Sequence, residues 1–234
     1  MKHLQIPPAQ DIARIVCPTL PETERRLTEY YMASTGVFNY SLAQNLSPIV
    51  FAHSVPLDQA LKACEQQRTD IGAKQNAEVL RLIWDAGESR TVRAYDLRPK
   101  VFRIRKDIEI KVAPPFYFVE HDQAHVFWLQ PRKTHALSDL QLGLLASIIR
   151  HTFLVDDFEN VGFEVLDLSV FPGTKYRAAR TFRLDSLVLV SDSEVHTLLQ
   201  QFATAFDRVR ARGVEHRKRP PKRPPEKPDL FDPK

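Results

Sequence analysis

Residues 116–130 constrain the fold more than any other part of the sequence. They hold two runs of strand-forming residues, FYFVE and HVFWLQ, on either side of the polar turn HDQA. Apolar runs separated by a short polar connection are typical of a β-hairpin. In the second run, residues 125–130, apolar side chains occupy both alternating sets of positions, so both faces of that strand must be covered. The sequence therefore predicts a sheet with this strand in its interior.

Helical segments on either side of this hairpin supply covering layers. Residues 57–86 precede it and have the apolar spacing of one helix, or of two helices separated near Gly72. Residues 138–154 follow it, and Ser138 with Gln141 has the spacing of a capping box at the start of a helix. We therefore predict an α/β (α+β) fold in which a small mixed central sheet is flanked by helices.

The last third of the chain adds more strand and helix. Residues 163–170 alternate as a strand, and residues 182–190 have the composition of another. A capped amphipathic helix is predicted to begin at Ser191, with Glu194 as the second member of its capping box, and to end at Gly213. The core domain is predicted to span residues 57–212.

The first part of the chain is predicted to be a helical extension, residues 1–56. Thr19 and Glu22 have capping-box spacing, and Gly36 is placed to end the helix that follows them. The stretch after Gly36 mixes helix and strand signals and carries no motif that indicates a function.

Residues 101–112, VFRIRKDIEIKV, are predicted to be one strand with alternating faces. One face is apolar except at Lys106, where we expect a bend. The other face is charged and comprises Arg103, Arg105, Asp107, Glu109 and Lys111.

The basic character of the chain is concentrated at its C-terminal end. The net charge is +4, yet residues 208–234 hold ten Lys and Arg against four Asp and Glu, and the remainder holds 23 against 25. Six of the 17 prolines lie in this stretch, so residues 213–234 are predicted to be a disordered or polyproline-like tail. Its candidate nucleic-acid-binding residues are Arg217, Lys218, Arg219, Lys222 and Arg223, which could contact phosphates; alternatively the prolines could bind a protein partner.

The order helix, three strands, helix and strand over residues 57–170 resembles the core of the PD-(D/E)XK nuclease superfamily. That resemblance implies a metal-binding Asp on the second strand and an E-x-K motif on the third. In this alignment Phe116 occupies the Asp position, and Gln130 occupies the position of the acid, with Lys133 following it. A Mg²⁺ site depends on carboxylate oxygens, so the resemblance implies a degenerate metal site.

A second alignment preserves the acidic residues. Glu109, Ile110 and Lys111 form a literal E-x-K sequence, and Asp96 precedes them. Alternation places Glu109 and Lys111 on one strand face, where a carboxylate could bind Mg²⁺ or Mn²⁺ and the lysine could stabilise charge. The same face carries other alternating charges, so a solvated strand face is the competing interpretation.

Other features indicate the compartment. Cys17 and Cys64 are the only cysteines, so there is no disulfide framework and no paired metal-binding knuckle. We find neither a secretory signal nor an apolar run of membrane-spanning length. The sequence predicts a cytoplasmic protein without membrane contact.

Three functional hypotheses follow. The first is a non-catalytic binding or assembly module with a degenerate nuclease-like fold, associated with nucleic acid and needing no cofactor. The second is a Mg²⁺- or Mn²⁺-dependent nuclease that uses Asp96, Glu109 and Lys111, or a site completed by Gln130 and Lys133. The third is a protein-interaction subunit that recruits its partner through the proline-rich tail.

Overall fold

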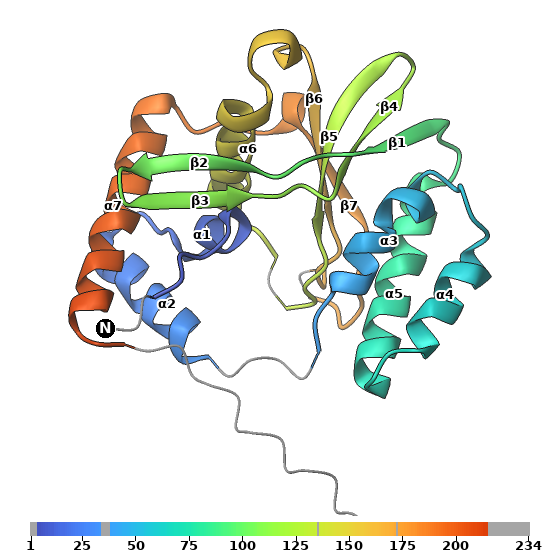
Figure 1. Cartoon of the computed structure of the whole chain (residues 1–234), viewed down its shortest axis with the longest axis horizontal. Coiled ribbons are helices and arrows are strands. Elements are labelled where there is room, and N and C mark those ends of the chain that lie inside the picture. Colours follow the sequence, from blue (N-terminus) through green and yellow to red (C-terminus); the bar gives the residue numbers. More distant parts are fainter. Residues whose placement is uncertain (1–3, 34–37, 135, 172, 215–234) are drawn as a thin grey trace, which may run out of the picture.

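A mixed five-stranded sheet forms the centre of the protein (Figure 1). The computed structural model describes residues 4–33, 38–134, 136–171 and 173–214. The strands of this sheet lie in the order β1-β4-β5-β6-β7, and only β5 and β6 are parallel. The strands are β1 (Val92–Asp96), β4 (Phe116–Glu120), β5 (Gln123–Gln130), β6 (Gly162–Asp167) and β7 (Arg180–Arg183). The predicted mixed α/β class is confirmed.

Helices cover both faces of the sheet (Figure 1). On one face α3, α4 and α5 pack around the apolar side chains of β4 and β5. On the other face α1, α6 and α7 enclose a second apolar cluster, and α2 packs along α7. The helices are α1 (Ala9–Ile15), α2 (Leu20–Met32), α3 (Ser41–Phe51), α4 (Leu57–Glu65), α5 (Asp70–Gly87), α6 (Asp139–Phe153) and α7 (Asp192–Ala211). Two short 3₁₀ segments complete the described elements, η1 (Asp156–Phe158) and η2 (Leu184–Ser186).

Strand β5 is the predicted interior strand. Val126 and Trp128 lie in the cluster with α6, whereas Phe127 and Leu129 lie in the cluster with α3 and α5. Glu120 pairs with Gln123, so the turn between β4 and β5 consists of two residues, His121 and Asp122. Both have positive φ. This is the turn chemistry that closes tight hairpins.

The predicted single strand at residues 101–112 is wrong. The structure has a hairpin of its own, β2 (Lys100–Arg105) and β3 (Ile108–Val112), which forms a separate two-stranded sheet inserted between β1 and β4. A continuous strand would have put Lys106 on the apolar face. The turn instead exposes that side chain, and the fully buried Ile108 joins the cluster with α6 and α7.

Several predicted boundaries change in the structure. Residues 57–86 form two helices, α4 and α5, and the hydroxyl of Thr69 accepts the N–H of Gly72 at the start of the second. The predicted strand at residues 182–190 is wrong beyond Arg183, where the chain turns into η2. The predicted capping boxes that begin α6 and α7 are both confirmed.

The predicted capping box at Thr19 is wrong. Its side chain makes no cap hydrogen bond, and its carbonyl instead accepts the hydroxyl of Thr23 at 3.0 Å. The helices of residues 1–56 divide between the two layers, since α1 and α2 pack with α6 and α7 and α3 packs on α5. The tail residues 215–234 lie outside the described residues.

Candidate functional site

The residues of the literal E-x-K alignment lie in two different sheets. Glu109 and Lys111 lie on β3 of the two-stranded sheet, and Glu109 accepts two hydrogen bonds from Arg103 at 2.5 and 2.9 Å. Asp96 ends β1 in the other sheet, where its Cα pairs with that of Phe116. The pairing of Glu109 with Arg103 matches the interpretation of a solvated, charged strand face.

The residues of the other alignment lie on the central sheet. Phe116 begins β4 and is fully buried among aromatic rings, with centroids 4.4 Å from Phe127 and 5.8 Å from Phe51. Gln130 ends β5, is buried, and accepts the backbone N–H of Arg132 at 3.2 Å. Lys133 follows in the loop, and its carbonyl accepts the N–H of Val170 at 2.8 Å.

A buried polar centre lies at the carboxyl ends of the two parallel strands. We use this name for Asp11, Arg14, Gln130, Arg132, Asp167, Ser169 and Arg180. Asp167 pairs with Gln130 across β5 and β6 and is fully buried. Arg180 binds its carboxylate at 2.7 Å, and the N–H of Ser169 donates to it at 2.9 Å. The charge of Asp167 is therefore already neutralised within the protein.

A second acid of the polar centre, Asp11, comes from α1 and is also bound by arginine. Arg132 lies 2.8 Å and Arg14 lies 3.3 Å from the same carboxylate oxygen. Tyr30 hydrogen-bonds to Asp11 as well, and burial, chiefly, raises the pKa of that phenol to about 12. Three arginines therefore surround two acids, so the polar centre has an excess of positive charge.

Arg177 connects the loops beside the polar centre to the helical layer. Its guanidinium donates to the carbonyls of Pro131 and Leu168, at 2.6 and 3.1 Å, and to the hydroxyl of Tyr40 at 2.8 Å. A further donor reaches the side chain of Gln75 on α5 at 2.9 Å. Arg177 thereby fixes the ends of β5 and β6 against α3 and α5, and its side chain is buried.

An exposed surface with aromatic and basic side chains lies over these strand ends. We call it the aromatic–basic surface and define it as Lys133, Phe171, Lys175 and Tyr176. The backbones of Phe171 and Tyr176 are hydrogen-bonded to each other at 3.3 Å, and the loop that holds them contacts Lys133 through Val170. Tyr176 is 81% and Phe171 50% exposed. Exposed aromatic rings on a loop that also carries a lysine are candidates for contact with a partner.

Sequence reasoning missed this surface. Its signal was the segment FPGTKY, in which two aromatic residues flank a Pro-Gly turn and a lysine. Turn residues indicate exposure, and an aromatic residue on either side of an exposed turn is a candidate binding residue. The spacing alone did not place Lys133 beside them, because that contact joins segments separated by α6 and β6.

A second buried charge cluster lies at the opposite end of the sheet. Arg90 donates to Glu120 and Glu164 at 2.8 Å each, and its guanidinium lies over the rings of Phe51 and Phe118. Burial lowers the pKa of Arg90. The hydrogen bonds to the two carboxylates raise this pKa by more, so the net shift is upward. This cluster closes the sheet edge and presents no cavity among the described pockets.

The described residues lack two kinds of feature, a metal-binding group and a membrane-spanning helix. No group of three or more His, Cys, Asp or Glu is placed to hold a metal ion in the described ranges. No helix within those same ranges has the length and apolar character needed to cross a bilayer. The tail candidates Arg217, Lys218, Arg219, Lys222 and Arg223 lie outside the described residues.

Comparisons with protein-family models, with curated proteins and with solved structures found no match.

Proposed function

We propose that this protein is a non-catalytic module that binds single-stranded nucleic acid through the aromatic–basic surface. The observation that carries the proposal is the exposure of Tyr176 and Phe171 on a loop that also holds Lys175 and is hydrogen-bonded through Val170 to the backbone of Lys133. Exposed aromatic rings stack on unpaired bases, whereas lysines next to them contact the phosphates. Neither interaction distinguishes one base sequence from another, so we expect binding with little sequence preference.

The chemistry of the polar centre supports binding over cleavage. The positions that the nuclease resemblance assigns to metal-binding acids are occupied by Phe116, in an aromatic cluster, and by the amide Gln130. The acids that do lie there, Asp11 and Asp167, are bound by guanidinium groups within 2.8 Å. Guanidinium groups repel a divalent cation and attract phosphate, so this end of the sheet favours an anionic partner.

The proposal extends to the tail and to the compartment. The tail residues Arg217, Lys218 and Arg219 would add phosphate contacts to those of the surface, strengthening binding at low salt. Cys17 and Cys64 are both free and buried, as is usual in a reducing cytoplasm. We therefore propose a cytoplasmic protein associated with nucleic acid.

Fluorescence anisotropy with a labelled single-stranded oligonucleotide tests the proposal in the full chain. Tyr176→Ala is expected to weaken binding by roughly 5- to 150-fold, because stacking of one base contributes about 1–3 kcal/mol. The matched control is Tyr95→Ala, since Tyr95 is an exposed aromatic residue on the far strand β1. Lys133→Gln and Lys175→Gln are expected to lower the slope of log K against log salt by about one charge each.

A second full-length variant separates the contribution of the tail. It replaces Arg217, Lys218, Arg219, Lys222 and Arg223 by Gln. If the surface is the binding site, Tyr176→Ala weakens binding in this background as well. Equal affinities of the wild type, Tyr176→Ala and Phe171→Ala for the oligonucleotide would refute the proposal. Cleavage of the oligonucleotide with Mg²⁺ or Mn²⁺, abolished by Glu109→Ala or Lys111→Ala, would refute its non-catalytic part.

A further inference from the structure

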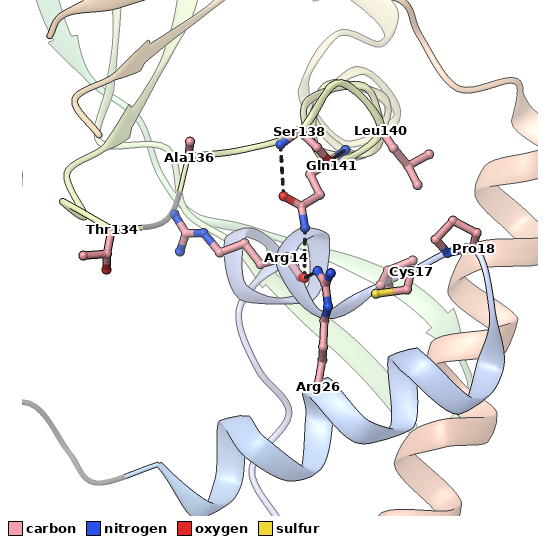
Figure 2. Close-up of a pocket in the computed structure, with 10 residues that line it drawn as sticks. Arg14, Cys17, Pro18, Arg26, Thr134, Ala136, Ser138, Leu140 and Gln141 are labelled. Carbon is pink, nitrogen blue, oxygen red and sulfur yellow. Dashed lines mark hydrogen bonds between the residues drawn. The ribbon is translucent and has the colours of Figure 1, made fainter. Parts of the chain in front are cut away.

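A cavity of about 380 Å³ lies beside the polar centre, and Arg14 belongs to both (Figure 2). It is lined by the end of α1, the loop that follows α1, the middle of α2, the start of α6 and the loop before α6. Its charged lining residues are Arg14 and Arg26, and none of the described residues that line it is acidic. Val16, Pro18 and Leu140 give it an apolar side. This composition is that of a small-molecule pocket for an anion with a short apolar body.

Arg14 has hydrogen-bonding capacity that the protein does not use. Its side chain is only 10% exposed, and its hydrogen bond among the described residues is a long one, 3.3 Å, to Asp11. Arg132 binds the same oxygen at 2.8 Å, so Arg14 shares that carboxylate with a closer partner. Its Nε–H is buried without an acceptor in the described structure. A buried donor without an acceptor is costly, and a bound oxyanion would supply acceptors for this guanidinium.

The charges around Arg14 also favour a bound anion. It faces Asp11, Asp167 and Arg132, and Asp167 is already bound by Arg180. Burial, first, and the neighbouring charge of Arg132, second, lower the pKa of Arg14 to about 10. The cationic form of Arg14 is thus less stabilised by the protein than an arginine usually is. An anion in the cavity would restore that stabilisation.

The start of α6 contributes further donors to the same cavity. The hydroxyl of Ser138 caps the N–H of Gln141 at 3.4 Å. The N–H groups of Asp139 and Leu140 have no carbonyl partner within the helix, because the first turn lacks one. The positive end of the helix dipole therefore adds to the two guanidinium groups.

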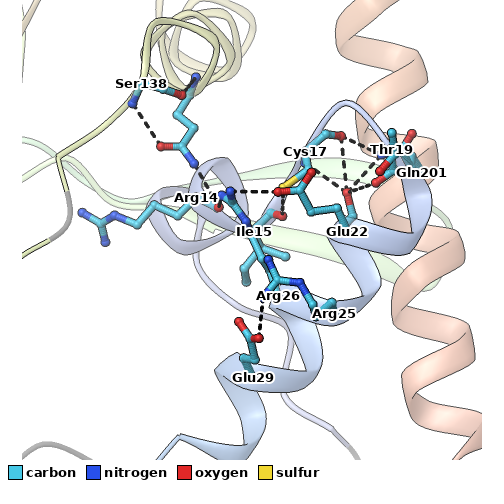
Figure 3. A network of polar contacts seen from close by, with 12 residues as sticks. Arg14, Ile15, Cys17, Thr19, Glu22, Arg25, Arg26, Glu29, Ser138 and Gln201 are labelled. Carbon is cyan, nitrogen blue, oxygen red and sulfur yellow. Dashed lines mark hydrogen bonds and ion pairs between the residues drawn. The ribbon is translucent and has the colours of Figure 1, made fainter.

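A network of polar contacts holds the walls of the cavity in place (Figure 3). The carbonyl of Arg14 accepts hydrogen bonds from Arg26 at 3.1 Å and from Gln141 at 3.0 Å, which joins α1 to both α2 and α6. The carbonyl of Cys17 accepts one from Gln201 on α7 at 2.7 Å. The donors that face the cavity are therefore positioned before any ligand arrives, which lowers the entropic cost of binding.

We propose that this cavity binds a compact phosphate dianion, such as the phosphate group of a small phosphomonoester. The Nε–H of Arg14 and the N-terminus of α6 supply donors that no carboxylate uses. Arg26, which is paired with Glu22 at 3.1 Å, adds a second guanidinium, so we expect a doubly charged oxyanion to bind better than a monoanion. The apolar side formed by Val16, Pro18 and Leu140 would contact the organic part of the ester. None of Lys133, Phe171, Lys175 and Tyr176, the residues of the surface proposed to bind nucleic acid, lines this cavity.

Titration of inorganic phosphate into the isotopically labelled full chain, followed by amide chemical shifts, tests this proposal. We expect saturable shifts at Leu140 and Cys17, which line the cavity. Arg14→Met is expected to weaken binding at least roughly tenfold, because a charge-assisted hydrogen bond is lost. The side chain of Arg26 is 37% exposed, so Arg26→Met should weaken phosphate binding less and leave the fold intact. The matched control is Arg25→Met on the same helix, because Arg25 is 59% exposed and is paired with Glu29.

The outcomes separate clearly. Saturable shifts at Leu140 and Cys17 that Arg26→Met weakens and Arg25→Met does not would support the site, even if Arg14→Met fails to fold. Shifts scattered over exposed lysines, or a folded Arg14→Met that binds phosphate as the wild type does, would overturn it. Acetate that binds as tightly as phosphate would overturn the assignment of a dianion. Oligonucleotide affinity should be unchanged in Arg26→Met, so failure here and failure of the proposed function are distinguishable.

Discussion

Replacing Arg90 by Met should destabilise the protein strongly while leaving its surface unchanged. Arg90 is 15% exposed and binds two carboxylates, Glu120 at 10% and Glu164 at 1% side-chain exposure. The variant keeps most of the apolar stem but removes the guanidinium, which both acids share and which lies over the rings of Phe51 and Phe118. Removing one partner of a buried ion pair costs about 3–5 kcal/mol. Arg183, which is 51% exposed and lies 3.5 Å from Glu120 and 3.3 Å from Glu164, keeps part of the compensation, so we expect a loss near the lower end of that range.

Urea denaturation at pH 7, followed by circular dichroism, measures this loss of unfolding free energy. The matched control is Arg103→Met, which breaks a pair with Glu109 of similar geometry at 68% and 45% side-chain exposure. An exposed pair contributes about 0–1 kcal/mol, so the control should lie close to the wild type. The double variant Arg90→Met, Glu164→Gln should recover part of the lost stability, because one of the two stranded charges is then absent.

The cost of Arg90→Met should also depend on pH. Hydrogen bonds from Arg90 hold the pKa of Glu120 below its usual range, against the opposing effect of burial. A carboxyl whose pKa is lowered by folding stabilises the protein above its unfolded pKa of about 4.3 and loses that contribution as the pH falls through the folded pKa. In the variant burial still raises the pKa of Glu120, and only the smaller effects of the charges on Arg183 and His121 lower it. The carboxylate is then less stabilised by folding than in the wild type, so its protonation costs less. The stability difference between wild type and variant should shrink as the pH falls from 7 towards 4.

Two results would refute this reasoning. One is a cost below about 1 kcal/mol at pH 7, no larger than that of Arg103→Met. The other is a stability difference that grows as the pH falls, since that sign requires the pKa of Glu120 to be raised by its arginine.

The remaining predictions concern a close backbone approach and metal binding. Gly162→Ala should lower the free energy of unfolding by about 1–3 kcal/mol. Its new Cβ would lie 2.2 Å from Nδ1 of His125, whose ring is stacked on Phe118. Urea denaturation measures the loss, and a neutral effect would show that the His125 ring moves freely. Isothermal titration of Mn²⁺ into the full chain should give no isotherm that depends on Glu109, since its carboxylate is engaged by Arg103. A saturable signal that disappears in Glu109→Ala would restore the metal-dependent alternative.

Local sequence patterns predicted the elements that local chemistry determines. The capping boxes at Ser138 and Ser191 fixed where two helices begin, because their hydrogen bonds lie within four residues. The covering of β5 on both faces followed from its apolar residues alone. The hairpin β2–β3 was missed because its period of two continues across the turn, and one residue, Lys106, was the whole signal for the break.

The candidate site depended on contacts that sequence patterns do not contain. Arg14, Arg132 and Arg180 come from three separate segments and meet only because β5 and β6 end side by side. The spacing of Asp11 and Arg14 on α1 indicates a possible ion pair, but nothing in the sequence indicates that Arg132 shares this acid or that a cavity lies beside it. The literal E-x-K at Glu109 shows the converse, since a motif with suitable spacing lies on a strand outside the central sheet.

The position of β5 between two apolar clusters has a consequence for how the protein unfolds. The same strand forms the wall of both clusters, with Val126 and Trp128 on one side and Phe127 and Leu129 on the other. Neither layer of helices can melt alone without exposing the apolar face that the strand presents to it, so the two layers should unfold in one cooperative transition. The two tryptophans report on the layers separately, because Trp128 packs on the α6 side and Trp84 on the α5 side. Strand β5 therefore couples the unfolding of the two apolar clusters.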